Sequence, residues 1–286
     1  MSRSSPSEDA FEIWSDYFSN HLSSEISDLV EANSDSEDCI PLNLSLSEAS
    51  KNDLNLFERI VSDPIAELEN GEFILQKMVE NEGAMFEVNL RFNDLPPENY
   101  KDPAKMSSKD IGELLWFDTL PDRIGPLRPW FKKAAWKCEK CSRITLVEVE
   151  RNVYSGPVPP KNCDKSEGGC GRMTKYNFRS EGKKKQELTD FELVRHYGTL
   201  LDIRNLKLSD VSVASKEFDQ SKEEKQTIPA VAVGQIARDI DSKIPIRVTG
   251  ILDIAGGVEY QFEIIGCDEV PKEKLKSIMK GWMEEE

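Results

Sequence analysis

The hydrophobic residues follow two different spacings along the chain, and the change falls at Phe86. Before it, apolar positions recur every three or four residues, which is the spacing of one face of a helix. A first helix is expected from Ala10, with its aromatic residues in the core. A second is expected where Asp63 provides a cap and Pro64 the first helical residue, and it runs through Met78. The N-terminal part therefore predicts a small helical domain.

From Phe86 the apolar residues alternate with polar ones, which is the pattern of a half-buried strand. Short segments of similar character follow, separated by Gly, Pro and polar residues. Such punctuation favours a barrel or a sandwich over a parallel sheet. The predicted strands are residues 86–92, 113–120, 134–137, 145–150, 174–178, 199–208, 230–233, 246–254 and 259–265, with a short extended piece at 40–46.

The net charge of −16 is distributed unevenly. Residues 1–80 hold 18 acidic and 4 basic side chains, a net of −14, so the remainder carries −16 + 14 = −2. Residues 123–143 hold seven basic side chains against one acidic, and residues 172–185 hold six against one. Such local fields bind phosphates despite an acidic total. The acidity therefore does not exclude nucleic acid, although each basic run is also compatible with a solvated charged face.

Six cysteines are too few for a disulfide framework in a chain of 286 residues. Four of them follow the order Cys-x2-Cys, x21, Cys-x6-Cys, which is close to the spacing of zinc ligands. We expect a structural zinc site at Cys138, Cys141, Cys163 and Cys170. Four ordinary buried cysteines remain an alternative, and a catalytic zinc would need an open position. The other two, Cys39 and Cys267, are expected to be ordinary thiols, small and buried or half-exposed.

Other chemistry has little support in the sequence. No Gly-x4-Gly-Lys-Ser/Thr phosphate loop occurs, and His21 and His196 stand outside any nucleophile or metal motif. We therefore expect no enzymatic activity from this chain. No apolar run of membrane-spanning length and no signal sequence occurs either, which favours an unsecreted protein without a membrane partner.

Basic and aromatic residues alternate closely in two places, residues 128–133 and residues 172–179. This mixture suits single-stranded nucleic acid, because cations follow the phosphates while rings stack on bases. Trp130 and Phe131 are equally compatible with the core of a barrel.

Short sequence blocks between residues 86 and 266 occur in a specific order. They are residues 88–92 with Asn93-Asp94-Leu95-Pro96, then Ser108-Lys109-Asp110-Ile111-Gly112-Glu113-Leu114, Leu127-Arg128-Pro129, residues 134–141, residues 201–208 and residues 247–254. In this order the chain resembles the N-terminal half of an archaeal minichromosome maintenance (MCM) replicative helicase. The acidic helical segment lies where that family carries its helical subdomain.

The resemblance implies an α+β multi-domain fold, a helical bundle plus a five-stranded oligonucleotide-binding (OB) type β-barrel with an inserted zinc-binding module. It also implies a homo-hexamer or double hexamer, joined with help from the zinc modules, that binds single-stranded DNA in its channel. Double-stranded DNA and replication proteins are further expected partners, in the cytoplasm at the nucleoid. The DNA-contact candidates are Arg128, Lys132, Lys133, Arg204, Lys207 and Arg247. For Arg204 and Lys207, outward-facing strand charges remain an equal alternative.

Three departures from the family are visible. The hairpin at Ala255-Gly256-Gly257 is short and uncharged, which weakens the case for a DNA contact there. The loop before the penultimate strands is reduced to Thr227-Ile228-Pro229-Ala230, and residues 182–198 are expected to be an insertion. An interaction scaffold that recruits protein partners without binding DNA is therefore the alternative function.

These inferences predict a domain order along the chain. It is a disordered leader (1–9), an acidic helical subdomain (10–85), the first part of the barrel (86–137), the zinc module (138–173), the second part of the barrel (174–270) and a C-terminal helix or linker (271–286).

Overall fold

The computed structural model describes residues 6–33, 39–149, 156–174, 188–211, 227–255 and 259–276. The chain forms two compact units: Arg128–Asp202 is the body of the first, and Ser5–Leu127 with Ile203–Glu286 makes the second. We call them the cysteine unit and the main unit. In the described part of the chain, no helix has the length and apolar character needed to cross a membrane.

The main unit begins with a group of helices. They are α1 (Glu8–His21), α2 (Ser23–Ala32), α3 (Leu46–Asn52), α4 (Leu54–Ser62) and α5 (Pro64–Asn81). The predicted cap is present, since the Asp63 side chain accepts a hydrogen bond from the Ala66 backbone N–H at the start of α5. The first helix starts earlier than predicted, because Ser7 caps it and Glu8 already belongs to its first turn. The sequence pattern missed α2, α3 and α4.

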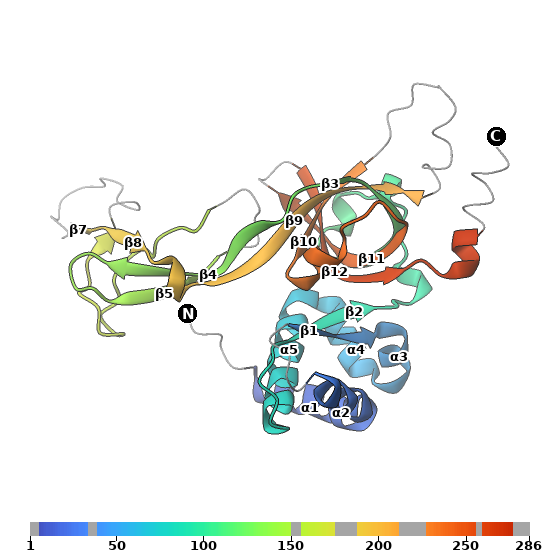
Figure 1. Ribbon diagram of the computed structural model, residues 1–286, viewed down its shortest axis with the longest axis horizontal. Coiled ribbons are helices and arrows are strands. Elements are labelled where there is room, and N and C mark those ends of the chain that lie inside the picture. The colour runs from blue at the N-terminus through green and yellow to red at the C-terminus, as the bar shows by residue number, and fades with distance from the viewer. Residues whose placement is uncertain are drawn as a thin grey trace, which may run out of the picture. The chain divides into compact units, whose positions relative to one another are not determined.

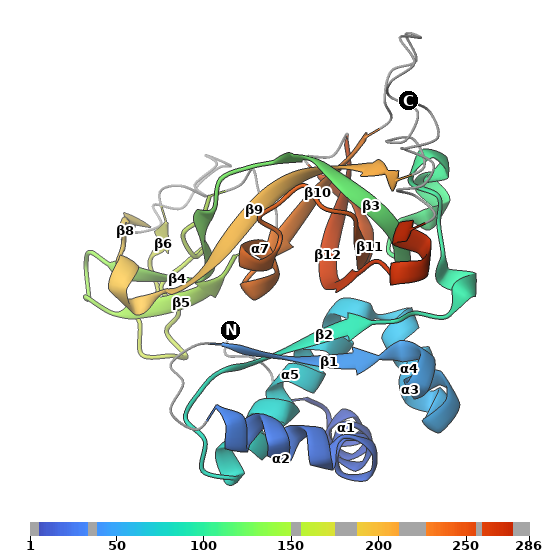
Figure 2. The same ribbon diagram turned by 45° about the vertical axis from the view of Figure 1, so that its right-hand side comes forward.

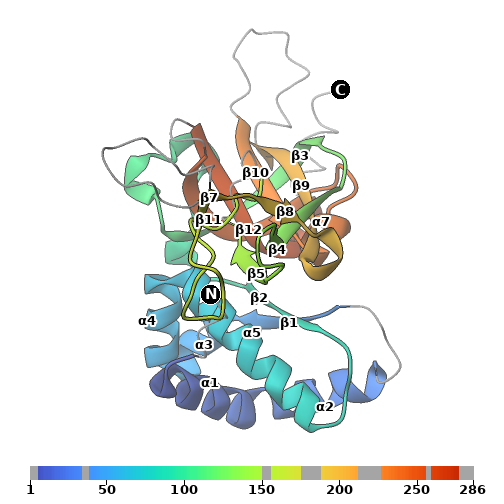
Figure 3. The same cartoon turned by 90° about the vertical axis from the view of Figure 1, so that its left-hand side faces the viewer.

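Three of the four aromatic residues of α1, Trp14, Tyr17 and Phe18, lie in the core as predicted, whereas Phe11 is 47% exposed. Trp14 is fully buried, stacks on Phe92 at a centroid distance of 6.4 Å, and donates from its indole Nε1 to Glu67 at 2.8 Å. Helix α5 packs against both α1 and the strand that carries Phe92 (Figure 3). Gly71 lies at this contact, where an added Cβ would meet a Leu90 methyl group at 2.6 Å and the Trp14 ring at 3.0 Å. The glycine is therefore a packing requirement of α5.

Strand β2 (Val88–Asn93) pairs in parallel with β1 (Ile40–Ser45), Leu42 opposite Leu90. The strand expected at residues 86–92 thus exists, but the prediction that it opens the barrel is wrong. It belongs to a separate two-stranded sheet. The extended piece predicted at 40–46 is its partner. Periodicity reports that a strand has one buried face but not which strand lies beside it.

Five strands of an eight-stranded sheet pair in a closed series, and all of them lie in the main unit except residues 199–202 of β9. They are β3 (Leu114–Ile124), β9 (Thr199–Asp210), β10 (Thr227–Val233), β12 (Glu259–Glu269) and β11 (Ile246–Ala255). In that order each pairs with the next, and β11 pairs back with β3. Only the β10–β12 pair is parallel. We call these strands the closed sheet (Figure 1).

Phe117 and Phe262 meet edge to face at 4.9 Å inside the closed sheet. A second core joins the closed sheet to the helices, because Leu114, Ile251 and Ile265 are buried together with residues of α1, α5, β1 and β2. Strands β1 and β2 lie between the helices and the closed sheet (Figure 2). The polar contact Arg91 to Asp239, on the short helix α7 (Gln235–Asp239), crosses the same boundary at 2.7 Å.

The loop predicted at residues 227–230 is not present, and the predicted hairpin and C-terminal helix are described only in part. Residues 227–230, expected to be a reduced loop, form the start of β10 and pair with β9 from Thr227 onward. The hairpin of β11 and β12 is paired up to Ala255 opposite Glu259, and its turn at residues 256–258 lies outside the described residues. Of the predicted C-terminal helix, residues 272–276 are helical and residues 277–286 lie outside the described part.

The cysteine unit contains β4 (Arg128–Cys138), β5 (Ile144–Glu148), β6 (Met173–Thr174), β7 (Leu188–Thr189) and β8 (Phe191–Leu193). Strand β4 pairs with β5 and β8, and β6 pairs with β7. Strand β4 therefore belongs to the compact unit that holds the cysteines, although it is also a neighbour of β9 in the same eight-stranded sheet. The described residues of the predicted insertion also belong to this unit. Residues 175–187, which include most of the strand predicted at 174–178 and Lys183-Lys184-Lys185, lie outside the described residues.

Candidate metal centre and basic surfaces

The four cysteines predicted to bind zinc come together in the cysteine unit. Their sulfur atoms all lie within 4.8 Å of one another, with Cys138 Sγ to Cys170 Sγ at 3.8 Å and Cys141 Sγ to Cys163 Sγ at 3.5 Å. Zinc–thiolate bonds of about 2.3 Å in a tetrahedron place sulfurs roughly 3.8 Å apart. The spacing therefore fits one zinc ion held by four thiolates.

Two backbone turns carry the four cysteines, and the two turns have the same pattern of backbone hydrogen bonds. In the first, Cys138 N–H donates to Arg143 O at 2.8 Å and Ser142 N–H donates to Cys138 O at 2.8 Å. In the second, Cys163 N–H donates to Arg172 O at 2.9 Å and Gly171 N–H donates to Cys163 O at 2.7 Å. The residue after each second cysteine has a positive φ, 61° at Ser142 and 75° at Gly171.

The longer Cys-x6-Cys spacing is explained by four extra residues within the second turn. Gly169 N–H donates to Asp164 O at 2.7 Å, and Cys170 N–H then points at Cys163 Sγ at 3.4 Å. A Cβ on Gly169 would lie 2.6 Å from the Cys163 sulfur, so the turn needs glycine there. Arg143 of the first turn and Glu167 of the second form an ion pair at 3.0 Å. The two turns are thus held together by a polar contact as well.

The surroundings of Cys138 and Cys163 shift the pKa values of these two thiols in opposite directions. Burial alone would raise the pKa of Cys138, but hydrogen bonds from the Thr189 hydroxyl and from the Cys141 and Lys140 backbone lower that pKa to about 6. Burial, reinforced by the neighbouring thiols, raises the pKa of Cys163 to about 12. A bound zinc ion would favour the thiolate form at all four positions, because its charge opposes both burial and mutual repulsion.

Sequence reasoning missed one residue of this centre. Thr189 is fully buried, and its Oγ1 lies 3.3 Å from Cys138 Sγ. It follows the last cysteine by 19 positions and belongs to no ligand spacing, so the sequence held no signal for it. The two remaining cysteines stand apart from the cluster. The Cys267 residue is half-buried, and this burial raises the pKa of its thiol to about 12.

The DNA-contact candidates of the cysteine unit lie on β4. Arg128 is exposed at its first residue. Lys132 and Lys133 are half-buried and already interact with other groups. Of the two aromatic residues, Trp130 is buried and Phe131 is half-buried under Gly198. Trp130 is therefore a core residue.

Two of the candidates in the main unit have partners within the chain. Arg204 is 9% exposed and donates from Nη1 to the Ile240 carbonyl oxygen at 2.8 Å. Arg247 holds the buried Asp118 through two hydrogen bonds, and its guanidinium lies over the Trp116 ring. The Arg204 side chain is therefore buried, and that of Arg247, which is 19% exposed, is occupied by Asp118.

Lys207 is exposed on β9, and Arg123 stands directly opposite it on β3. Both side chains are exposed, so the closed sheet carries a cross-strand pair of cations. Arg123 was noted in the sequence only as part of a basic run. The pairing of β3 with β9, over more than 80 residues of sequence, is what brings it beside Lys207.

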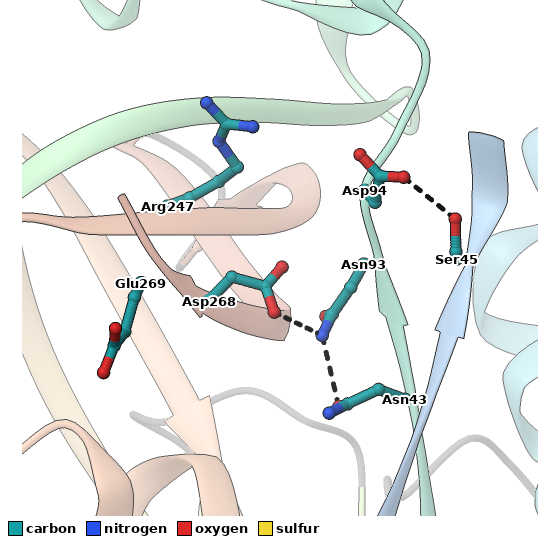
Figure 4. Close-up of a pocket in the computed structure, with 7 residues that line it drawn as sticks. All are labelled: Asn43, Ser45, Asn93, Asp94, Arg247, Asp268 and Glu269. Atoms are coloured by element: carbon teal, nitrogen blue, oxygen red, sulfur yellow. Dashed lines mark hydrogen bonds between the residues drawn. The ribbon is translucent and has the colours of Figure 1, made fainter. Parts of the chain in front are cut away.

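A polar pocket of about 290 Å³ lies where β1 and β2 meet β11 and β12 (Figure 4). Asn93 is at its centre and donates from Nδ2 to Asp268 at 2.7 Å and to the Asn43 side-chain oxygen at 3.1 Å. Burial raises the pKa of Asp268, and nearby Asp94 adds to the effect although Arg247 opposes it. The contacts inside this pocket connect the two sheets of the main unit.

Comparison with known proteins gives a result at the level of the fold. No model of a protein family matches the sequence, and no curated protein sequence matches it. A 1.8 Å crystal structure of the N-terminal domain of an archaeal MCM matches over 92% of this chain and 99% of that chain, with a TM-score of 0.64 and 19% sequence identity. The predicted resemblance is thereby confirmed at the level of the fold. The chain has the mixed α+β fold of the N-terminal domain of an archaeal MCM.

Proposed function

We propose that this chain is the DNA-binding and ring-assembly N-terminal portion of an MCM-type replicative helicase. The observation that carries the proposal is the likeness in fold to an archaeal MCM N-terminal domain over 92% of the chain. The proposal assigns binding and assembly to this chain and no catalytic step.

The closed sheet is the proposed OB-type barrel. Its support is the circuit of pairings β3–β9–β10–β12–β11–β3, which leaves none of these five strands at a free edge of the circuit. OB barrels bind single strands across a face that combines cations with accessible rings. The exposed pair Arg123 and Lys207 lies on two of these strands.

The proposed metal is a structural zinc ion bound by Cys138, Cys141, Cys163 and Cys170. Four thiolate ligands fill a tetrahedron, so the ion would supply folding energy and no reactive position. The cysteine unit needs this support because both large cores of buried hydrophobic residues lie in the main unit. Its proposed role is in joining subunits or rings.

The proposed DNA contacts are Lys207 with Arg123 in the main unit and Arg128 in the cysteine unit. Lys132 and Lys133 are secondary, since both already have partners. Arg204 and Arg247 are left out of the set because their guanidinium groups are committed to Ile240 O and Asp118. Single-stranded DNA is the proposed ligand, and double-stranded DNA is the comparison in its test.

An interaction scaffold without DNA binding is the second candidate. Its support is the loss of Arg204 and Arg247 from the exposed basic surface, together with the net charge of −14 over residues 1–80. Such a surface would recruit basic protein partners.

Salt-titrated binding separates the two candidates. The full chain is titrated against a fluorescently labelled single strand and against a duplex of the same sequence, between 50 and 300 mM salt. The helicase proposal expects affinity for the single strand that falls steeply with salt. A chain that ignores both DNAs at the lowest salt would favour the scaffold.

A further inference from the structure

Thr189 is placed against the cysteine cluster by strands that follow it in the sequence. Its strand, β7, pairs with β6 so that Thr189 stands opposite Thr174, and β8 pairs with β4 so that Phe191 stands opposite Cys138. Between them, the Asp190 carbonyl oxygen accepts the Glu139 N–H at 3.1 Å. The segment 188–193 therefore closes over the first cysteine turn, and Thr189 is 1% exposed there.

The Thr189 hydroxyl has two hydrogen-bond partners but a single proton. Oγ1 lies 3.3 Å from Cys138 Sγ and 3.2 Å from the Asp190 carbonyl oxygen. A carbonyl oxygen only accepts, and a metal-bound thiolate also only accepts, so the hydroxyl can serve one of them at a time.

The Asp190 carbonyl oxygen keeps another hydrogen bond when the Thr189 hydroxyl rotates away from it. The Asp190 oxygen keeps the Glu139 N–H, so rotation of the Thr189 hydroxyl toward sulfur leaves no buried carbonyl unsatisfied. A hydrogen bond donated to a buried thiolate stabilises its charge and fixes its orientation toward the metal, as the outer partners of metal ligands generally do.

We propose that Thr189 is a positioning residue of the metal centre, whose hydroxyl donates to the Cys138 sulfur in the metal-bound state. The segment 188–193 contains no metal ligand, but through this hydrogen bond its contact with the site depends on whether the metal is bound. The inference rests on the zinc centre of the proposed function and is independent of DNA binding and of ring assembly.

The test compares Thr189→Val, which keeps the size but removes the hydroxyl, with Thr189→Ser, which keeps the hydroxyl. Thr174→Val is the matched control, because it removes a buried hydroxyl from the facing strand. Zinc affinity of the full, reduced chain is measured by competition with a chelating dye. Cobalt(II) is then substituted for zinc, and the sulfur-to-cobalt charge-transfer band is recorded.

We expect Thr189→Val to bind zinc about ten-fold more weakly and to shift the cobalt band. Thr189→Ser and Thr174→Val should match the wild type in both measurements. Equal losses in Thr189→Val and Thr189→Ser would assign the effect to methyl packing and overturn the proposal. Unchanged affinity and spectrum in Thr189→Val would overturn it as well. A wild-type chain that binds no zinc would overturn both this inference and the proposed zinc centre.

Discussion

Arg247 donates two hydrogen bonds to Asp118, from Nε at 2.8 Å and from Nη2 at 3.2 Å. The Asp118 side chain is 2% exposed, and its other cationic partner is Lys274 of the C-terminal segment. The same guanidinium lies 4.3 Å from the centre of the Trp116 ring. Arg247 therefore neutralises a buried carboxylate of the closed sheet, which is a structural role.

Removing Arg247 should destabilise the fold. Arg247→Ala leaves Asp118 buried with one cation in place of two, so we expect the free energy of unfolding to fall by about 2 kcal/mol. Urea denaturation at pH 7 measures it. Arg123→Ala, an exposed arginine on the strand that carries Asp118, should stay within about 0.5 kcal/mol of the wild type. Equal stability of the two variants would contradict the structural role.

Asp118 should also give stability a specific pH dependence. Burial would raise its pKa, but hydrogen bonds from Arg247 and Lys274 outweigh burial and hold the pKa below the ordinary 3.8. A carboxyl whose pKa is lower in the folded state stabilises it above the unfolded pKa and loses that contribution as pH falls through the folded pKa. The advantage of wild type over Asp118→Asn should therefore be constant from pH 7 to about 5 and shrink below about 4.

Asp268 provides the control of opposite sign for that experiment. Because burial raises its pKa, the wild type should gain stability relative to Asp268→Asn as pH falls toward 4. Urea denaturation across this pH range follows both differences. Parallel changes in the two variants would contradict the assigned contacts.

The exposed cation pair of the closed sheet should control DNA affinity. Arg123→Ala with Lys207→Ala is expected to weaken single-strand binding and to reduce the slope of log affinity against log salt by about two. Lys51→Ala with Lys77→Ala removes the same charge from the helices and should leave the slope unchanged. Fluorescence anisotropy measures both. A slope that responds equally to the two double variants would show a general charge effect and refute a site at Arg123 and Lys207.

Gly71 should resist substitution although it lies within a helix. Alanine improves helix propensity by roughly 1 kcal/mol, but its Cβ would overlap a Leu90 methyl group and touch Trp14. We expect Gly71→Ala to lower the free energy of unfolding by about 1 kcal/mol. Leu90→Val removes the overlapping carbon, so the double variant should lose less than the sum of the two single losses. Strict additivity in urea denaturation would contradict this packing.

Metal removal should act on the cysteine unit. We expect one zinc per chain in the purified, reduced protein, and its loss on strong chelation should expose residues 128–202 to protease while the main unit persists on its own cores. Cys163→Ser should have the same effect without chelator. Cys39→Ser and Cys267→Ser remove thiols outside the cluster and should keep the metal. Protease resistance of the metal-free chain throughout would contradict a structural role for zinc.

Local patterns predicted much of this molecule. The four clustered cysteines were predicted because each pair lies within one short turn, and α5 was predicted because Asp63 and Pro64 mark its start. Partners distant in sequence were not predictable. The strand expected at residues 86–92 exists as Val88–Asn93, yet only the tertiary fold pairs Leu90 with Leu42.

The same limit explains the errors in the candidate site. Arg204 has the polar pattern of an outward strand residue, but its side chain is buried and donates from Nη1 to the Ile240 carbonyl oxygen at a helix end. Thr189 carries no ligand signature, and strands β7 and β8 bring it to Cys138. Arg123 becomes a candidate DNA contact only because the register of β3 and β9 places it opposite Lys207. A site formed by residues that are distant in the sequence cannot be predicted from the spacing of residues along the chain.

The central claim is that this chain is a ring-forming, zinc-stapled N-terminal portion of a replicative helicase. Native mass spectrometry of the full chain, with and without a single-stranded oligonucleotide, tests it most directly. The claim predicts particles of six or twelve chains with one zinc per chain, and oligonucleotide retained on those particles. A metal-free monomer at every concentration, with no oligonucleotide bound, would contradict it.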